Sequence, residues 1–430
     1  MTSQPARLID AHPQQAEIAE DKTRFKVAVT GRRWGKSILG DEVALYKAFN
    51  KHKSLNWIVC PTRDMARDIH WDNLKTRCKD LDWKIKVNES NLSILNLETN
   101  SKIILKTADN PDRLRGRGLD FVCIDEFRDM DQSIWKDILR PALSDKKGEA
   151  LFISTPNGHD ILYDLYKLGQ GNNPEWKSWH YKTIDSPFIE SSEIEQARID
   201  LDRLSFEREY EASFDTFGGR PYHAYSERNN LIQEIRYDLP FILTCDFNAT
   251  LKPMSWALGQ AWKNDKVSNT YWHKCFSNKF TNTQTQCEIV HEYFETLKYY
   301  PKELWLYGDY SSKKETSNSV YSDWEIIQNY FRNKVTNIQL KIKKCMSIRN
   351  SITATNIRLC NMIGEIRQFV NPEQCKELIE DWNKCEWKPN GRELDDSNDD
   401  RTHMCRAVDY YNDYEHPYRA DSKITITNAA

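Results

Sequence analysis

The stretch Phe25–Ser37, F-K-V-A-V-T-G-R-R-W-G-K-S, decides the fold of the first half of this 430-residue chain. An apolar run from Phe25 to Val29 leads into a turn with two glycines, and an amphipathic run from Ile38 to Phe49 follows. A strand, a glycine-bearing turn and a helix in this order are the layout of a phosphate-binding loop. Glycine lets the backbone approach phosphate groups closely, so that backbone amides and the helix N-terminus can donate hydrogen bonds to them.

The last two side chains of this stretch are of the types that a site for ATP and Mg²⁺ requires. Lys36 is placed to reach the β- and γ-phosphates, and the hydroxyl of Ser37 is placed to hold Mg²⁺. The match is imperfect, because Thr30 stands where the usual first glycine would be, and a plain strand-to-helix turn is the alternative. We therefore predict ATP and Mg²⁺ as cofactors. The residues expected at the nucleotide are Thr30, Gly31, Arg32, Arg33, Trp34, Gly35, Lys36 and Ser37.

The composition indicates a globular protein of two or three domains. Hydrophobic residues make up 39% and charged residues 29% of the chain, and we expect neither a membrane span nor a signal peptide. The eleven cysteines lie at least ten residues apart, which favours reduced thiols in a cytoplasmic protein over disulfides or a zinc motif. Because the net charge is −3, any surface that binds DNA must come from local basic patches. The run at 341–344 is a candidate, and a solvated face is the alternative.

Before the phosphate-binding loop, residues 8–20 (L-I-D-A-H-P-Q-Q-A-E-I-A-E) are expected to form one short helix. The amide of a glutamine can make paired hydrogen bonds to the edge of adenine. Gln15, or Gln14 beside it, is the candidate for this contact, and a glutamine on an exposed helix surface is the alternative. After the loop, residues 55–60 are predicted to be a strand, and 92–97 with 102–106 a hairpin.

A loop rich in arginine follows, A-D-N-P-D-R-L-R-G-R-G-L-D at residues 108–120. Arg113, Arg115 and Arg117 surround two glycines, so this stretch is not a helix interior. Clustered guanidinium groups favour an anion as partner. That anion is a nucleotide phosphate, the DNA backbone or the site of a neighbouring subunit, and a solvated charged run is the alternative.

The next stretch, F-V-C-I-D-E-F (Phe121–Phe127), is an apolar strand that ends in two carboxylates. Ligands of α/β sheets bind at the carboxyl ends of the strands, which is where Asp125 and Glu126 fall. Asp125 is expected to hold the water shell of Mg²⁺, and Glu126 to polarise the attacking water. A third apolar strand within Ala150–Gly158 ends in small polar residues that can sense the γ-phosphate. Together with the phosphate-binding loop, these strands predict ATP hydrolysis.

The chain changes character beyond residue 190. A charged amphipathic stretch, 190–215, is followed by Gly218-Gly219-Arg220-Pro221, which predicts a domain junction. Two later apolar runs end in Asp246 and Asp309. Carboxylates at the ends of central strands can bridge two divalent ions in a phosphodiester-cleaving site, whereas turn residues at strand ends are the alternative. The order of strands, helix and acids suggests a ribonuclease-H-like fold.

These motifs resemble those of the large terminase subunits of tailed bacteriophages, and the resemblance spans about residues 8–415. It implies an α/β protein with an N-terminal P-loop (RecA/ASCE-like) ATPase domain followed by a ribonuclease-H-like nuclease domain. The family's phosphate-binding loop also carries an arginine, here Arg32 or Arg33, and Arg115 is expected to act on a neighbouring subunit. The matching segments are G-R-R-W-G-K-S (31–37), L-R-G (114–116), C-I-D-E-F (123–127) and I-S-T-P-N-G (153–158).

The resemblance departs from the family pattern at the third acid of the nuclease site. The family often ends with T-H-x-x-D-A-x-x-Y, whereas this chain has T-H-M-C-R-A-V-D-Y at 402–410, with Arg406 at the expected acidic position. Asp409, which shares a helix face with Arg406, is the predicted ligand beside Asp246 and Asp309. Asp400 and His403 are the alternatives.

The family implies an ATP-driven motor that packages double-stranded DNA into a procapsid, and a nuclease that cuts the DNA concatemer with Mg²⁺ or Mn²⁺. The implied partners are DNA, the portal protein, a small terminase subunit and further copies of this chain in a ring, in the host cytoplasm and away from membranes. Two alternatives stay open: an ATP-switched, DNA-binding assembly factor with a decayed nuclease site, and a helicase-like translocase. The expected bounds are 1–190 for the ATPase domain, 191–221 for a helical linker, 222–418 for the nuclease domain and 419–430 for a tail.

Overall fold

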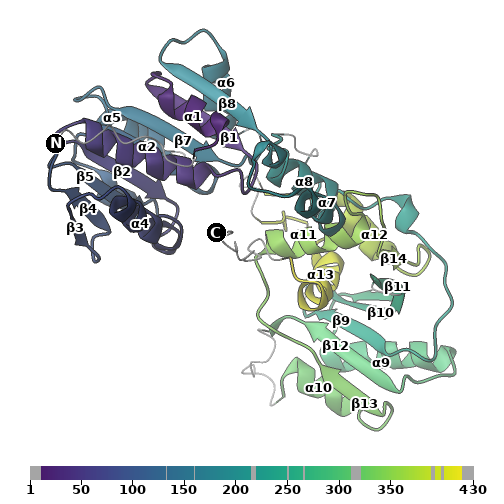
Figure 1. Cartoon of the computed structure of the whole chain (residues 1–430). Helices are drawn as coiled ribbons and strands as arrows, with labels where there is room; N and C mark the ends of the chain where they lie inside the picture. Colours follow the sequence, from purple (N-terminus) through teal and green to yellow (C-terminus); the bar gives the residue numbers. More distant parts are fainter. Residues whose placement is uncertain are drawn as a thin grey trace. The chain divides into compact units, whose positions relative to one another are not determined.

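The structure is a computed structural model that describes residues 11–131, 133–158, 160–214, 219–248, 251–264, 267–310, 321–388, 393–398 and 401–418. Contacts within the chain divide it into two compact units, both drawn in Figure 1. The first unit comprises Met1–Ala197 and Phe206–Thr216, and the second comprises Arg198–Ser205 and Phe217–Ala430.

Residues 191–209 form two helices, α7 (Ser191–Asp200) and α8 (Arg203–Glu209), where the sequence predicted one amphipathic stretch. Each of these two helices has residues in both units, so they mark no single boundary between the units. The bounds that the sequence suggested for the linker and for the domains on either side therefore stay a prediction. None of the described helices has the length and apolar character that a bilayer crossing requires.

The first unit is built on an eight-stranded sheet in the order β3-β4-β5-β2-β6-β7-β1-β8. Strands β5, β2, β6, β7, β1 and β8 run parallel, while β3, β4 and β5 pair antiparallel. The carboxyl ends of β1 and β6 therefore meet at one edge, with β7 between them. The strands are β1 Phe25–Thr30, β2 Leu55–Cys60, β3 Ile85–Asn88, β4 Ser93–Asn96, β5 Lys102–Thr107, β6 Phe121–Asp125, β7 Glu149–Ser154 and β8 Trp176–Tyr181.

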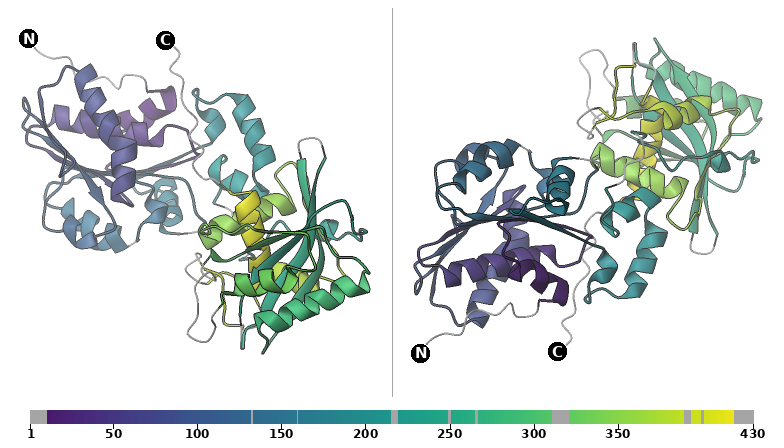
Figure 2. Two further views of the ribbon diagram at one scale, coloured as in Figure 1. Left: turned by 90° about the horizontal axis from the view of Figure 1, so that it is seen from below. Right: turned by 90° about the horizontal axis from the view of Figure 1, so that it is seen from above.

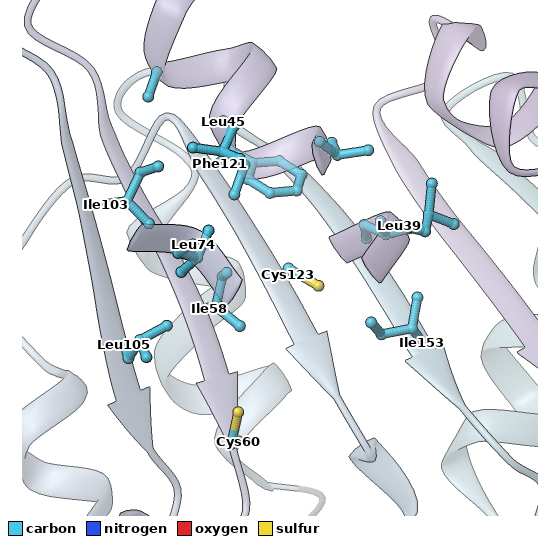
Figure 3. Close-up of a cluster of buried hydrophobic side chains, with 14 of the residues drawn as sticks. Leu39, Leu45, Ile58, Cys60, Leu74, Ile103, Leu105, Phe121, Cys123 and Ile153 are labelled. Carbon is cyan, nitrogen blue, oxygen red and sulfur yellow. The ribbon is translucent and has the colours of Figure 1, made fainter. Parts of the chain in front are cut away.

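Helices cover both faces of this sheet (Figure 2). Successive strand residues face opposite sides, so Ala28 of β1 packs in one core cluster and Val27 and Val29 pack in the other. Figure 3 shows the first cluster, in which Leu74 lies near Ile58 and Leu39 lies near Ile153. Its helices are α1 Pro13–Glu20, α2 Lys36–Asn50 and α4 Asp72–Asp80, and those of the other face are α5 Arg140–Ala142 and α6 Ile161–Gln170.

The second unit is built on a six-stranded sheet in the order β13-β12-β9-β10-β11-β14. Strands β9, β10 and β11 form an antiparallel meander, and β12 returns to lie parallel to β9. This arrangement is the ribonuclease-H-like topology that the sequence predicted. The strands are β9 Phe241–Asp246, β10 Met254–Asn264, β11 Val267–Asn278, β12 Glu303–Gly308, β13 Asn337–Leu340 and β14 Gln368–Val370.

Two core clusters cover the two faces of the second sheet, and helices contribute to both. Residues of α9 (Thr283–Thr296) and α10 (Asp323–Phe331) pack in one cluster. Residues of α11 (Ile348–Leu359), α12 (Lys376–Lys384) and α13 (His403–Glu415) pack in the other. The edge strands β3, β8, β13 and β14 were not predicted, because short sequences such as N-I-Q-L (Asn337–Leu340) carry no apolar run of strand length.

Candidate active sites

The phosphate-binding loop lies where β1 ends at Thr30 and α2 begins at Lys36. Gly35, the residue before the helix, has φ of 101°, a left-handed conformation that favours glycine. A side chain at this position would also meet the Gln15 amide, because a Cβ built there lies 2.5 Å from Gln15 Nε2. The loop therefore depends on glycine for both its backbone turn and its packing.

Four of the predicted residues meet at this loop. Lys36 Nζ lies 3.1 Å from Glu126 Oε1, and the Ser37 hydroxyl donates a hydrogen bond of 2.8 Å to Asp125 Oδ2. Asp125 ends β6 and is buried, and Glu126 directly after it adopts a left-handed backbone with φ of 52°. Such backbone strain in a non-glycine residue is concentrated at functional sites. The sequence placed these four residues correctly at one sheet edge.

The end of β7 supports Glu126. The hydroxyls of Ser154 and Thr155 each lie 3.4 Å from Glu126 Oε2 and donate to it. These are the small polar residues that the sequence suggested for sensing the γ-phosphate. The structure places them against the carboxylate expected to activate water, so a shift in this strand end would move that carboxylate.

A buried histidine that the sequence did not reveal lies behind Asp125. His70 sits in a π-helical segment, Ala66–Trp71, and is 0% exposed. Its Nε2 lies 3.0 Å from Asp125 Oδ2, and its Nδ1 lies 2.7 Å from Asp41 Oδ1. Asn73 donates a hydrogen bond to the other oxygen of Asp41. No motif marks His70, although irregular π-helical turns are frequent at functional sites.

The imidazole and the two carboxylates shift one another's titration. Burial lowers the pKa of His70, but the charge of Asp41 and the hydrogen bonds to both carboxylates outweigh it and raise that pKa well above its usual value. Burial raises the pKa of Asp125, yet the hydrogen bond and charge of His70 hold it below its usual value. His70 is therefore a cation that keeps Asp125 ionised.

A second ion-pair cluster surrounds Glu209 at the end of α8. Arg32 of the phosphate-binding loop, Arg128 and Arg208 all contact the buried Glu209 carboxylate. Burial raises the pKa of Glu209, but the three guanidinium charges outweigh it and lower the pKa well below its usual value. Arg128 also lies 3.5 Å from Glu126. The cluster thus connects the loop, the predicted water-activating acid and α8.

The remaining predicted loop residues occupy distinct positions. Arg33 is exposed, with φ of 62°, and Gly31 is buried. Trp34 is fully buried and stacks on Tyr181 at 5.2 Å between ring centroids. Trp34 therefore anchors the loop to β8.

The two glutamines of α1 contact the loop. Gln15 donates a hydrogen bond of 2.8 Å to the carbonyl of Gly35 and accepts one from the backbone amide of His12. Gln14 accepts a hydrogen bond from the indole of Trp34. In this structure Gln15 supports the loop backbone, a role different from the adenine contact that the sequence suggested. The physical reason is that its amide, 1% exposed, is turned to the loop by the packing of α1.

The arginine loop lies on the surface of the first unit. Arg113, Arg115 and Arg117 are exposed, while Leu114 and Leu119 between and after them are buried. The Arg115 side chain is 58% exposed, and its contact with Asp112 is 3.5 Å long. A loop anchored by leucines therefore presents three guanidinium groups to solvent, as a contact with an external anion requires.

The two predicted nuclease acids lie at one edge of the second sheet. Strands β9 and β12 pair in parallel with Cys245 opposite Gly308. Asp246 and Asp309 are the next residues on the two strands, so they leave the sheet side by side. Carboxylates in this arrangement can share divalent cations.

Helix α13 contributes two further groups to this edge. His403 Nδ1 lies 2.9 Å from Asp246 Oδ2, and the Tyr410 hydroxyl lies 3.4 Å from Asp246 Oδ1. Burial, together with the charges of Asp246 and Asp309, raises the pKa of Tyr410 above its usual value. The Nε2 atom of His403 is buried and has no hydrogen-bond partner among the described residues. The ring nitrogen that faces the Asp246 carboxylate is Nδ1, so Nδ1 is the atom placed to reach a metal ion at this edge.

The structure does not bring Asp409 to this edge. Its carboxylate is fully buried and accepts hydrogen bonds from Tyr222 at 2.8 Å and Thr355 at 2.6 Å. Arg406, at the position where the family has an acid, donates to the same carboxylate at 2.9 Å. Burial raises the pKa of Asp409, and the neighbouring guanidinium opposes that effect. In this structure Asp409 is therefore the partner of Arg406, and its role as the third ligand stays a prediction.

The reason lies in the rotation of α13. Residues of an α-helix advance by about 100° each, so Asp409 lies about a third of a turn away from the side that carries His403 and Tyr410. Sharing a face with Arg406 makes Asp409 its ion-pair partner and not its substitute. Asp400, the other alternative, lies outside the described residues.

The first sheet carries the P-loop and has β7 between β1 and β6, and the second is a ribonuclease-H-like sheet with two aspartates at one edge. Together the two sheets define a two-domain protein of the ATPase–nuclease fold class. The first unit is similar to the terminase large subunit family. Residues 27–212 match the family model described as the N-terminal part of the T4-like-virus-type terminase large subunit. The resemblance that the sequence motifs suggested is thereby confirmed.

Individual relatives agree with this assignment. The chain is 28% identical over 212 residues to the terminase large subunit of Escherichia phage T5, and 28% identical over 235 residues to that of Thermus phage G20c. The alignments cover 49% and 47% of this chain, and the chain spans about half the length, 48% in each case, of these relatives. The large terminase of a thermophilic bacteriophage, solved in complex with ADP, shares the fold, with a TM-score of 0.59 and 15% identity over 93% of this chain and 98% of that one.

Proposed function

We propose that this chain hydrolyses ATP to drive double-stranded DNA into a procapsid and cuts that DNA with a metal-dependent nuclease. The observation that carries the proposal is the convergence of Lys36, Ser37, Asp125 and Glu126 at one sheet edge of the first unit. The pair of aspartates at an edge of the second sheet supports the nuclease activity. The family of the first unit supports DNA packaging as the process that both serve.

The residues at the first site fit bound Mg²⁺ and ATP. Asp125 Oδ1 is buried and has no hydrogen-bond partner among the described residues, so it is an oxygen for which a cation or its water is the natural partner. Asp125 and Ser37 would hold Mg²⁺, which supplies charge neutralisation on the phosphates when bound. Lys36 would contact the β- and γ-phosphates, and Glu126 would accept the proton of the attacking water. Ser154, Thr155 and Arg128 hold the Glu126 carboxylate in place.

His70 is a positioning residue in this proposal. Replacing it by glutamine removes the cation between Asp41 and Asp125 and frees Asp125 to turn, so we expect ATP turnover to fall about 10- to 100-fold, as for other outer-shell residues. The Mg²⁺ concentration at half-maximal rate should rise with it. Asn73→Ala is the matched control, because Asn73 contacts Asp41 but not Asp125. A His70→Gln chain with the parental rate and Mg²⁺ dependence would show that the histidine only fills space.

Arg115 is proposed to act on a neighbouring subunit. An arginine supplied from outside a site is worth about 10³ to 10⁵ in the rate of phosphoryl transfer. Mixing Arg115→Ala subunits, whose own loop is intact, with inactive Lys36→Ala subunits should therefore restore hydrolysis in assemblies shown to form. Arg113→Ala removes another exposed arginine two residues away and should leave turnover within a few-fold of the parental rate. Absence of recovery in mixed assemblies would assign Arg115 to DNA contact or to its own site.

The residues at the second site fit a divalent cation. Asp246 and Asp309 provide hard oxygen ligands, and His403 provides the nitrogen Nδ1, which lies 2.9 Å from Asp246 Oδ2. Such ions, Mg²⁺ or Mn²⁺, stabilise attacking and leaving oxygens in phosphodiester cleavage. Asn248 and Tyr410 contact Asp246 and orient it. We therefore propose His403, and not Asp409, as the third protein ligand.

Packaging implies partners that we also propose: double-stranded DNA, the portal protein, a small terminase subunit and other copies of this chain in a ring, in the host cytoplasm. DNA-stimulated ATP hydrolysis by the purified chain, and protection of DNA inside procapsids, test the motor. Cleavage of plasmid DNA with Mn²⁺ tests the nuclease.

A second candidate function rests on Arg406. Because this cation stands where the family has an acid, and Asp409 neutralises it away from the sheet edge, the chain can be an ATP-switched assembly factor that binds DNA without cutting it. This function would be supported if plasmid DNA stayed intact after incubation with Mn²⁺ while DNA still stimulated the hydrolysis of ATP.

A further inference from the structure

Three buried side chains that the proposed activities do not use meet where α12 ends and α13 begins. Asp381 lies in α12, Cys385 is the residue that ends that helix, and Cys405 lies in the first turn of α13. One ligand-type atom from each lies within 4.8 Å of the other two. Their exposed fractions are 2%, 2% and 0%.

The spacing of the two sulfur atoms agrees with a shared metal ion. Cys385 Sγ and Cys405 Sγ lie 3.8 Å apart, well beyond the disulfide bond length of about 2.05 Å. A tetrahedral Zn²⁺ with two Zn–S bonds of about 2.3 Å requires an S···S separation of about 3.8 Å. One carboxylate oxygen of Asp381 lies within 4.8 Å of both sulfur atoms, so two sulfurs and one oxygen gather around one point.

The surroundings of Asp381 hold its carboxylate in place. Its Oδ2 accepts hydrogen bonds from the backbone amides of Met404 at 3.0 Å and Cys405 at 3.1 Å, at the N-terminus of α13. Burial raises the pKa of Asp381 to about 6, in spite of these hydrogen bonds. Ligating carboxylates are commonly fixed by such outer-shell donors. The carboxylate is therefore oriented before any ion binds.

An entry path leads to the cluster. A cavity of about 330 Å³ is lined in part by Asp381 and Met404, with Glu377 and Glu380 on its wall. Lys279 and Arg401 also line this cavity, and Arg401 pairs with Glu380 at 2.8 Å, so the wall carries charges of both signs. A water molecule from the cavity can complete a four-coordinate shell. The two thiolates select a thiophilic ion over Mg²⁺ or Mn²⁺, which prefer oxygen ligands.

We propose that Asp381, Cys385 and Cys405 form a binding site for a thiophilic divalent cation such as Zn²⁺, separate from the nuclease acids. Binding breaks the two S–H bonds, forms two metal–thiolate bonds and releases the two protons to the buffer. The ion ties the end of α12 to the start of α13, the helix that carries His403 against Asp246. The site is inferred only from the positions of these three side chains, so the inference does not depend on whether the chain cuts DNA.

Titration with Co²⁺ tests the site, because only thiolate ligands give the ion an intense sulfur-to-cobalt charge-transfer band. The full-length chain, reduced and freed of metal with a chelator, should develop this band with one equivalent of Co²⁺, and Zn²⁺ should abolish it. Cys385→Ser and Cys405→Ser should each weaken binding by about 100-fold or more. Cys375→Ser is the matched control, since Cys375 is buried at the other end of the same helix. Asp246→Asn should leave the band unchanged.

Thermal unfolding gives a second readout. Zn²⁺ should raise the melting temperature of the parental chain and of Cys375→Ser, because an ion bound only by the folded state stabilises it, but not that of Cys385→Ser. Circular dichroism of each metal-free variant establishes that it is folded before the titration. A parental chain with no charge-transfer band, or a band that survives in folded Cys385→Ser, would overturn the proposal. A reduced chain whose melting temperature does not change with Zn²⁺ would also overturn the proposal.

Discussion

Lys36→Ala and Glu126→Gln are expected to abolish ATP hydrolysis in two different ways. Lys36→Ala removes the positive charge beside the phosphates, so nucleotide binding and turnover should both fall, turnover by at least about 10²- to 10³-fold. Glu126→Gln keeps the shape of the side chain but removes the proton acceptor, so binding should stay nearly intact while turnover falls about 10²- to 10⁴-fold. Equilibrium binding of a labelled nucleotide and steady-state phosphate release measure the two effects separately.

Lys47→Ala is the matched control for this experiment. Lys47 lies in the same helix as Lys36, but it pairs with Glu149 at the other end of the sheet. Its loss should leave hydrolysis within about twofold of the parental chain, as expected for an isolated partly exposed ion pair. If Glu126→Gln hydrolysed ATP at the parental rate, Glu126 would not be the water-activating residue, and the strained backbone at this position would need another explanation.

Asp246→Asn is expected to eliminate DNA cutting while ATP hydrolysis remains at the parental level. Removing a direct ligand should cost at least as much as loss of an outer-shell group, so the rate of plasmid nicking should fall by about 100-fold or more. His403→Ala should reduce cutting as well, with the loss partly overcome by higher Mn²⁺ concentration. Gel analysis of plasmid DNA over a range of Mn²⁺ concentrations provides the measurement.

Asp409→Asn separates this assignment from the one that the sequence favoured. In the structure the buried Asp409 pairs with the partly buried Arg406, so the variant should melt at a lower temperature, because breaking a buried ion pair costs about 3 to 5 kcal/mol. Below that temperature it should still cut plasmid DNA. An Asp409→Asn chain that is as stable as the parent but cuts no DNA would restore Asp409 as the third ligand and remove His403 from that role.

Much of the first site follows from local sequence. Alternation of apolar residues in β1, a glycine that adopts a left-handed backbone at Gly35, and acids directly after the apolar run of β6 are all features of adjacent residues. Parallel strands then place Lys36 and Glu126 at the same edge by topology alone. Similar reasoning places Asp246 and Asp309 at one sheet edge, because each directly follows an apolar run that forms a strand.

His70 shows where this reasoning stops. It lies 55 residues from Asp125 and in an irregular helical turn, so no spacing rule connects the two. Its role arises because packing of that segment against the sheet brings an imidazole between two carboxylates. The Cys385–Cys405 pair is similar, since 20 residues separate the two cysteines and only the packing of α12 on α13 brings their sulfurs within 3.8 Å.

The sequence by itself determined the two-domain fold, the phosphate-binding loop and the two pairs of acids, because each depends on backbone propensities and strand ends that neighbouring residues encode. Only the tertiary structure decided which residue of α13 faces Asp246. That helix is buried on almost every side, from His403 to Asp413, so its sequence has no exposed face from which a rotation could be predicted. Packing against the sheet and against α11 sets the rotation, and it turns His403 to the acids and Asp409 into the core.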